Sequence, residues 1–233
     1  MPPRPVAIVT GARSGIGLQT ARQLATLGWD LTIAARREKT LLEAAEALPD
    51  PVLALARDCG RTDHIDEIIS ETHAKFGRID CLINNAGFAP ACAIPDSTPE
   101  TLKQVFDVNS VGPAYAIARV WPIMVAQGGG RIVNISSMAT QDPFPGLFMY
   151  AAAKASVNLM ARSVANEGEA HGIRGFSVAP GAVETPMLRG IVSVEDLPTS
   201  ACLTPAQVAD VVVACATGER DGDNGSTILI STP

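Results

Sequence analysis

The chain has 233 residues, enough for one large α/β domain, and 47% of them are hydrophobic, so a sizeable core is available. Charged residues make up 18%, the formal net charge is −6, and no basic block is present. This composition argues against a disordered chain and against a nucleic-acid or anionic-membrane partner.

Short apolar runs alternate with longer helical stretches along the chain. Strands are predicted at 6–10, 31–35, 52–56, 79–85, 130–136, 175–180 and 226–231. Helices are predicted over 15–28, 38–48, 63–76, 99–126 and 150–171. This order indicates a Rossmann-type doubly wound parallel sheet of about seven strands with helices on both faces. We expect a single domain over 1–233, with a ligand-facing loop at 182–204 after the sixth strand.

The cysteines and the N-terminus bear on the cellular compartment. An odd number of cysteines without a CxxC pair argues against a disulfide framework or a zinc site and favours buried, reduced thiols at Cys59, Cys81, Cys92, Cys202 and Cys215. The histidines, at 64, 73 and 171, lack metal-ligand spacing, so no metal is expected. The N-terminus has no signal-peptide core, and no apolar run reaches the roughly 18 residues of a membrane span. We therefore expect a cytoplasmic protein.

The stretch "TGARSGIG" (10–17) follows the first predicted strand and opens the first predicted helix. Its glycines, Gly11, Gly15 and Gly17, allow a sharp turn and let a pyrophosphate approach the free N–H groups of the helix. The spacing is GxxxGxG, which differs from the commonest dinucleotide fingerprint. A tight strand–helix turn without a ligand is the alternative interpretation.

The end of the second predicted strand, "LTIAARR", is where dinucleotide folds read the adenosine ribose. Ala35 stands where a carboxylate would bind the two hydroxyls of NAD, and Arg36 and Arg37 follow it. Guanidinium groups suit a 2′-phosphate, so NADP(H) is favoured over NAD(H). Arg13 adds a cation in the glycine loop, and Asp58 is placed to meet the adenine amino group. A solvated helix start is the alternative interpretation of the arginines.

The glycine motif "TGARSGIG", taken with five more features in chain order, resembles the short-chain dehydrogenase/reductases over nearly the whole chain. "NNAG" (84–87) is similar to the motif at the end of the family's fourth strand, and Asn109 falls at its active-site asparagine. "NISS" (134–137) falls where the family carries its catalytic serine, and "YAAAK" (150–154) matches its YxxxK signature. "PG" (180–181) with Thr185 matches the cofactor loop after strand six. Ser137 lies 13 residues before the tyrosine, as in the family, so Ser136 is taken as structural.

The resemblance implies the site residues. The catalytic set is Asn109, Ser137, Tyr150 and Lys154. The cofactor-binding set, including the arginines and Asp58, is Gly11, Arg13, Ser14, Gly15, Ile16, Gly17, Arg36, Arg37, Asp58, Asn85, Ala86, Gly87, Tyr150, Lys154, Pro180, Gly181, Val183 and Thr185.

Hydride transfer to a ketone requires a proton donor at the carbonyl oxygen. Tyr150 and Lys154 lie four residues apart on one helix face, so the ammonium is expected to lower the phenol pKa and to hold the nicotinamide ribose. Ser137 stabilises the developing oxyanion. By the resemblance, Asn109 holds a water that links Lys154 to solvent. The alternative interpretation of Tyr150 and Lys154 is a helix-surface pair.

The chain departs from the family pattern in places. Thr140 stands where the family often has glycine, so the loop behind the serine is expected to differ. The ending "ILISTP" lacks the family's frequent glycine-rich tail, and the short stretch between Thr185 and Thr204 predicts a small substrate lid.

The expected substrate is a small, partly apolar carbonyl or alcohol compound. The residues that either line its pocket or belong to the core or a subunit contact are Phe144, Leu147, Phe148, Met187 and Leu188. By resemblance, the helices at 99–126 and 150–171 pair across a two-fold axis, giving a homodimer or homotetramer. Two functional alternatives stay open, an NAD-linked dehydrogenase and a non-catalytic NADP(H)-binding redox sensor.

Overall fold

The computed structural model describes residues 3–49 and 52–231. Within these residues, seven parallel strands form one sheet in the order β3-β2-β1-β4-β5-β6-β7. They are β1 (Val6–Thr10), β2 (Asp30–Ala35), β3 (Leu53–Ala56), β4 (Cys81–Asn84), β5 (Gly130–Ile135), β6 (Ile173–Pro180) and β7 (Thr227–Ile230). The predicted doubly wound parallel sheet is therefore confirmed. Thr232 and Pro233, the last two residues of the ending "ILISTP", lie outside the described residues.

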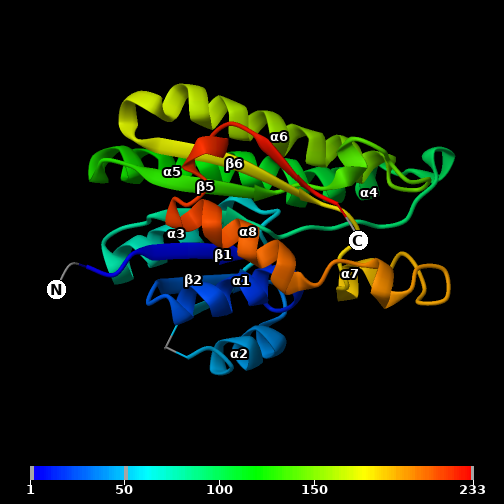
Figure 1. The fold of residues 1–233 in the computed structure, drawn as a ribbon, viewed down its shortest axis with the longest axis horizontal. Coiled ribbons are helices and arrows are strands. Elements are labelled where there is room, and N and C mark those ends of the chain that lie inside the picture. Colours follow the sequence, from blue (N-terminus) through cyan, green and yellow to red (C-terminus); the bar gives the residue numbers. More distant parts are fainter. Residues whose placement is uncertain (1–2, 50–51, 232–233) are drawn as a thin grey trace.

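Helices cover both faces of the sheet (Figure 1). One face packs against α1 (Gly15–Thr26), α2 (Glu38–Glu46) and α8 (Pro205–Thr217). The other packs against α3 (Thr62–Phe76), α5 (Gly112–Gln127) and α6 (Phe148–Gly168). Successive strand residues point to opposite faces, so Val9 lies in the first core and Ile8 in the second. Both faces are buried, which is why the strands read as continuous apolar runs.

The stretch predicted as one helix over 99–126 is helical throughout, but a π turn divides it. Helix α4 (Pro99–Phe106) is followed by a π-helical turn, Asp107–Val111, and then by α5. The side chain of Asn109 donates to the carbonyl of Val105 at 2.8 Å. That carbonyl lies four residues earlier and would accept the Asn109 backbone N–H in a regular α-helix. A side chain inserted into the backbone ladder distorts it, and π turns occur mostly at functional sites.

Helix α8 was missing from the predicted elements. Thr204 and Gln207 form a capping box. The Thr204 hydroxyl accepts the Gln207 backbone N–H, the Gln207 side-chain oxygen accepts the Thr204 backbone N–H, and Pro205 occupies the first turn. These are standard helix-start signals, so the sequence did carry the information. The segment counted as a loop at 182–204 also contains a short helix, α7 (Pro186–Arg189).

The cysteine prediction holds for four residues and is wrong for Cys92, which is partly exposed. Burial raises the pKa of the Cys59 and Cys215 thiols to about 12, so both stay protonated at neutral pH. In the part of the chain that the structure describes, no helix has the length and apolar character to cross a membrane.

The first residue of α5 generates a stability prediction. A Cβ on Gly112 would lie 2.1 Å from the carbonyl oxygen of Cys59, which is backbone and has little room to move. We expect Gly112→Ala to lower the free energy of unfolding by about 2–3 kcal/mol, because the clash forces a backbone shift. Urea denaturation measures this.

Gly222→Ala is the matched control, because a Cβ there meets nothing within 4 Å. It should leave the free energy of unfolding nearly unchanged. Equal stabilities for the two variants would contradict the packing argument.

Candidate active site

The β1–α1 turn approaches the β4 turn so closely that two glycines are required. A Cβ on Gly11 would lie 2.8 Å from the Ala86 Cα, and one on Gly17 would lie 2.4 Å from the Asn85 Nδ2. Gly11 also has a φ of 69°, in the left-handed region. The structure therefore brings the glycine loop and "NNAG" together, as their assignment to one cofactor site requires.

The hydroxyl of Thr10 joins these two turns. It donates to the carbonyl of Ile83 at 3.2 Å and accepts the backbone N–H groups of Asn85 and Ala86, each at 3.0 Å. The Asn85 side chain donates to the Thr10 carbonyl at 2.8 Å. Thr10 was absent from the predicted site, although it is the first residue of the glycine motif. Its contribution is to hold Asn85 and Ala86 against the loop.

The N-terminus of α1 is free to receive an anion. Ser14 is the N-cap residue, yet its side chain makes no capping hydrogen bond, and the first turn contains no acidic residue. The free N–H groups and the helix dipole favour a phosphate at this position. Ile16, the next predicted contact, is partly buried against the core beneath the turn. A Cβ on Gly15 would lie 3.1 Å from Thr185, so the loop after β6 reaches this helix start.

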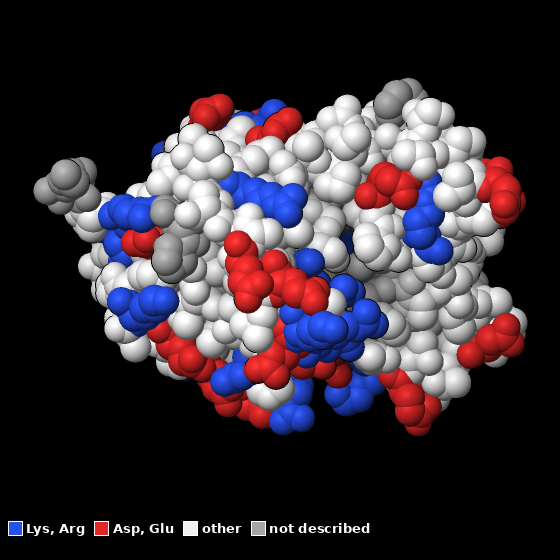
Figure 2. Space-filling view, turned by 90° about the horizontal axis from the view of Figure 1, so that it is seen from below, with Lys and Arg blue, Asp and Glu red and all other residues white. Residues whose placement is uncertain are grey.

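Arg13, Arg36 and Arg37 gather at one end of the site. Burial lowers the pKa of Arg13, and the charges of Arg37 and then Arg36 lower it further. The three guanidinium groups are therefore close enough to interact electrostatically. Arg36 and Arg37 are exposed, and none of the three pairs with a carboxylate among the described residues. Figure 2 shows basic side chains collected beside a hollow on this face of the molecule.

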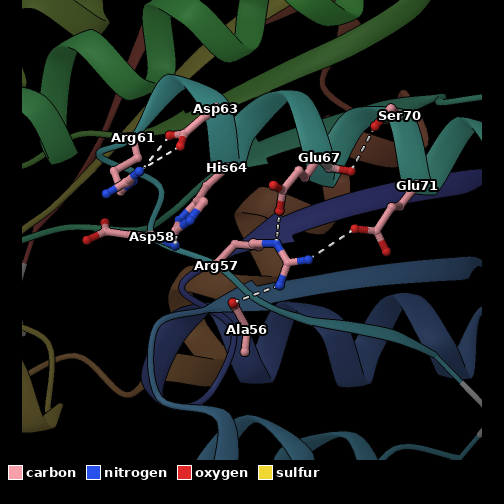
Figure 3. A network of polar contacts seen from close by, with 9 residues as sticks. All are labelled: Ala56, Arg57, Asp58, Arg61, Asp63, His64, Glu67, Ser70 and Glu71. Carbon is pink, nitrogen blue, oxygen red and sulfur yellow. Dashed lines mark hydrogen bonds and ion pairs between the residues drawn. The ribbon is translucent and has the colours of Figure 1, made fainter.

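The neighbouring arginines on the β3 side are already paired (Figure 3). Arg57 binds Glu67 and Glu71 of α3, the latter at 3.3 Å, and Arg61 binds Asp63 at 2.6 Å. Within residues 3–49 and 52–231, these pairs leave Arg13, Arg36 and Arg37 as a positive group at this end of the sheet without a carboxylate partner.

Asp58 is held in a defined turn at the end of β3. Its backbone N–H donates to His64 Nδ1 at 2.9 Å, and its Oδ1 accepts from the Gly60 N–H at 3.0 Å. In Figure 3 the Asp58 side chain points away from the Arg57 network. Its Oδ2 has no hydrogen-bond partner among the described residues, which leaves one oxygen for an exocyclic amine.

Ser137, Tyr150 and Lys154 meet where β5 ends and α6 begins. Ser137 is the N-cap of a 3-10 turn, Met138–Thr140, and the phenol of Tyr150 hydrogen-bonds with it. Lys154 is buried, and its Nζ donates to the carbonyl of Ile135 at 2.6 Å. The same Nζ lies 5.7 Å from the centroid of the Tyr150 ring. Ser136 is buried and bonds the Lys154 carbonyl at 3.3 Å, which fits its expected structural part.

The pKa of Tyr150 is higher than the sequence suggested. Burial raises the pKa of the phenol to about 12, and the hydrogen bond with Ser137 opposes this shift. Burial is thus the larger effect in the protein without cofactor, where the Lys154 ammonium donates to the Ile135 carbonyl, and the lowering of the phenol pKa by Lys154 stays a prediction. Burial also lowers the pKa of Lys154 to about 8. At neutral pH the phenol keeps its proton and the lysine stays mostly charged.

Asn109 and Lys154 converge on Gly87. A Cβ on Gly87 would lie 3.2 Å from Asn109 Oδ1, 3.3 Å from Met187 Cε and 3.8 Å from Lys154 Nζ. The Asn109 amide donates to the carbonyls of Phe88 and Val105, and its oxygen accepts from the Phe88 N–H at 3.2 Å. Both donor hydrogens are thus used by backbone, so any water on this side chain must bind the remaining lone pair of Oδ1.

The segment after β6 completes the site. Gly181 donates to Ile230, and Val183 is buried and forms a bridge with Leu203 just after Pro180 ends the strand. The hydroxyl of Thr185 accepts the Leu188 N–H at 3.3 Å and so caps α7. Figure 1 shows α7 beyond the end of the sheet that lies opposite the N-terminus, and the small substrate lid stays a prediction.

The structure separates the five candidate pocket residues. Leu147 is buried, Phe148 packs against the cluster around Val105 and Met149, and Leu188 takes part in the cap of α7. Met187 is 41% exposed beside Gly87, and Phe144 is 72% exposed. Of the five, Met187 places its side chain against the predicted site residue Gly87, whereas Leu188 contacts the predicted site residue Thr185 through its backbone N–H.

Thr140, the departure from the family pattern, fits without a clash. Its hydroxyl donates to the Ser137 carbonyl at 2.9 Å and accepts from Asn158 at 3.2 Å. The loop behind the serine is thereby tied to α6.

These observations test whether a dinucleotide fits. The two glycine turns leave a cradle that a Cβ would fill, and a helix N-terminus without a side-chain cap lies beside it. Beyond it lie three arginines that form no ion pair with any carboxylate the structure describes. The donor set suits a pyrophosphate and a further phosphate. Among the described residues no cluster of histidine, cysteine or carboxylate side chains could hold a metal ion.

Comparisons with known proteins agree with this geometry. The family model for short chain dehydrogenase matches residues 5–196. The 2-(R)-hydroxypropyl-CoM dehydrogenase of Xanthobacter autotrophicus is 35% identical over 97% of this chain and 96% of its own. The 3-oxoacyl-[acyl-carrier-protein] reductase of Thermotoga maritima is 33% identical over 97% and 95%. A solved 3-ketoacyl-(acyl-carrier-protein) reductase from Brucella melitensis, complexed with NADH, superimposes with a TM-score of 0.91 at 26% identity, over 98% and 97%.

The matched family model spans the glycine loop, the serine and the YxxxK pair, and both relatives align over nearly their full length. The chain therefore belongs to the short-chain dehydrogenase/reductase family, and it is an NAD(P)-dependent oxidoreductase that acts on carbonyl or alcohol groups.

Proposed function

We propose that this protein interconverts a ketone and a secondary alcohol by hydride transfer, with NADP(H) as its cofactor. The observation that carries the proposal is the meeting of Ser137, Tyr150 and Lys154 beside the glycine cradle, at one edge of the sheet. The bound nicotinamide would supply the hydride. The residues of this chain would then orient the carbonyl and move the proton.

Tyr150 is the proposed proton donor. Its pKa of about 12 keeps the phenol protonated at neutral pH, which is the form needed to reduce a carbonyl. Ser137 hydrogen-bonds the phenol and is placed to share the carbonyl oxygen, where negative charge develops. Lys154 is charged and buried one turn further along α6, where it would bind ribose hydroxyls and favour the phenolate after proton transfer. Asn109, through its remaining lone pair, is the proposed holder of a water on the path to solvent.

The redox-sensor alternative requires dinucleotide binding without turnover. Conserving the full geometry of Ser137, Tyr150 and Lys154 has no use in a sensor, and this favours the enzyme. NADPH oxidation against a panel of ketones and aldehydes separates the two, since binding without turnover on any compound supports the sensor.

The tyrosine generates the first functional prediction. Tyr150→Phe removes the transferable proton while keeping the ring, so we expect kcat to fall about 10²–10⁴-fold. Fluorescence titration should show an unchanged Kd for NADPH. Unchanged turnover would remove Tyr150 from the mechanism.

Tyr115→Phe is the matched control, because the Tyr115 hydroxyl donates to Asp66 on α3 at 2.9 Å, away from the site. It should keep full turnover.

The preference for NADP(H) rests on Arg13, Arg36 and Arg37. Their mutual proximity and lack of acidic partners favour an anion at the end of β2, where Ala35 offers no carboxylate to a ribose. The NAD-linked alternative stays open, because the Brucella melitensis neighbour is described with NADH.

Arg36→Asp tests the cofactor preference. The change removes a guanidinium and adds a carboxylate, so the Kd for NADPH should rise about 10–100-fold, in line with about 1.5–3 kcal/mol for a charged hydrogen bond. The Kd for NADH should change little or fall. Lys39→Asp, at an exposed position on α2, is the charge-matched control. Equal or tighter binding of NADH by the unmodified protein would refute the preference.

We also propose that α5 and α6 form a contact between copies of this chain. A groove of about 610 Å³ runs between them, lined by Ala114, Ile117, Ala118, Trp121, Ser156, Leu159, Met160, Ser163, Val164 and Glu167. Small residues let helices approach closely, and Leu159 is 62% exposed in the groove. Pairing about a two-fold axis would bury this apolar face in a dimer or tetramer.

Light scattering tests the assembly. Leu159→Arg should shift the mass of the particle toward that of one chain, because it places a charge in the buried contact. Leu42→Arg, an equally apolar exposed position on α2, should keep the mass of the unmodified protein. A single-chain mass for the unmodified protein would rule out the contact.

The single-domain organisation and the cytoplasmic location stay predictions.

A further inference from the structure

The loops after β4, β5 and β6 surround the proposed reaction centre. They lie at the carboxyl edge of the sheet, where parallel folds bind their ligands. The Cys92 N–H donates to the Gly146 carbonyl at 2.9 Å, which joins the first two loops. Met187 of the third loop lies against Gly87 of the first. Residues 85–98, 136–147 and 181–204 thus form the mouth through which a substrate reaches Tyr150.

The charge of this mouth is negative. The three loops contain one basic residue, Arg189, and five acidic ones, namely Asp96, Asp142, Glu184, Glu195 and Asp196. All of the acidic residues except Glu184 are exposed. Lys154, the other cation near the centre, is 3% exposed and bonded to the Ile135 carbonyl.

Arg189 has no donor left for a substrate. Its Nε donates to Glu184 Oε1 at 2.8 Å, and its Nη1 donates to the carbonyls of Ser193 at 3.0 Å and Leu197 at 2.9 Å. Its Nη2 donates to Glu184 Oε2 and to Cys202 Sγ, the latter at 3.8 Å. These contacts use all five N–H groups of a guanidinium. Arg189 therefore fixes the lid and is not available to an anion.

The same loops expose large apolar side chains. Phe144 is 72% exposed, Ile94 68% and Val194 55%, and Met187 is 41% exposed next to the reaction centre. In Figure 2 the part of the surface that lies across the hollow from the basic side chains is mostly white, with scattered acidic groups and a basic group beside one of them. The two ends of the cleft thus differ in charge, one suited to phosphate and the other not.

We propose that the carbonyl substrate of this enzyme is an uncharged apolar molecule, free of any anionic carrier. This rests on the proposed function. A carbonyl attached to a phosphopantetheine, coenzyme A or sulfonate group needs cations at the mouth, and here it meets carboxylates and a saturated arginine. The substrate class therefore differs from those that the names of the carrier-linked relatives state for them.

Two substrate pairs with the same reacting ketone test this at saturating NADPH. The first is the N-acetylcysteamine thioester of acetoacetate, which is uncharged, against acetoacetyl-CoA. The second is ethyl acetoacetate against the acetoacetate anion. In each pair the uncharged compound should have the higher kcat/KM at low ionic strength. For acetoacetyl-CoA, kcat/KM should rise about threefold between roughly 20 and 200 mM salt, because salt screens the repulsion.

A charge reversal on the lid adds a test within the protein. Glu195→Lys, at an exposed position on the mouth, should raise kcat/KM for acetoacetyl-CoA about two- to fivefold at low salt and leave the uncharged thioester unchanged. Glu169→Lys makes the same charge change at an exposed position after α6, at the opposite edge of the sheet. It should alter neither substrate.

A higher kcat/KM for acetoacetyl-CoA that falls with added salt would overturn the substrate class while leaving the proposed function intact. A response to Glu195→Lys that Glu169→Lys reproduces would overturn the part given to the mouth. Failure to oxidise NADPH with any carbonyl compound is a different result, since it would overturn the proposed function and the substrate class with it.

Discussion

The close contact between the turn after β1 and the turn after β4 holds the whole site in place. At this contact Gly11 and Gly17 lie against Asn85 and Ala86 with no room for a Cβ, and the Thr10 hydroxyl accepts the backbone N–H groups of Asn85 and Ala86. Because strand order changes direction between β1 and β4, this is also where the sheet opens a crevice. The contact therefore sets both the cofactor cradle and the floor on which the β5 and β6 residues are arranged.

The two ends of this crevice differ in the positive charge that they offer to a ligand. Arg36 and Arg37 follow β2 and pair with no carboxylate in the described part of the chain, whereas Arg57 and Arg61 nearby form ion pairs with carboxylates of α3. At the other end, Arg189 uses its hydrogen-bond donors within its own segment, and Lys154 is buried one helical turn after Tyr150. In the proposed function, a cation placed inside the protein acts on the phenol and on ribose hydroxyls without attracting anions from solvent. The proposed phosphate and the proposed uncharged carbonyl would thus lie at opposite ends of the crevice.

Several features of the site depend on distortions or contacts with no sequence signature. The π turn at Asp107–Val111 arises because the Asn109 amide takes the Val105 carbonyl, and it interrupts what reads as one continuous amphipathic helix. The arginine of the lid finds Glu184, Ser193, Leu197 and Cys202 only once the segment has folded back on itself. Helix propensity and apolar periodicity are local properties, so neither reports such contacts.

The sequence by itself determined the strand order along the chain, the parallel α/β class and the positions of the glycine loop, the serine and the YxxxK pair. These follow from local apolar patterns and from motifs whose spacing is fixed by one turn or one strand. It also carried the capping box of α8, which was overlooked. Only the tertiary structure decided the high pKa of Tyr150 and the partial exposure of Cys92. It also decided which partners take the N–H groups of Arg189 and which backbone groups the Thr10 hydroxyl binds. Each of these depends on burial or on partners distant in the chain, and those are set when the three layers pack together.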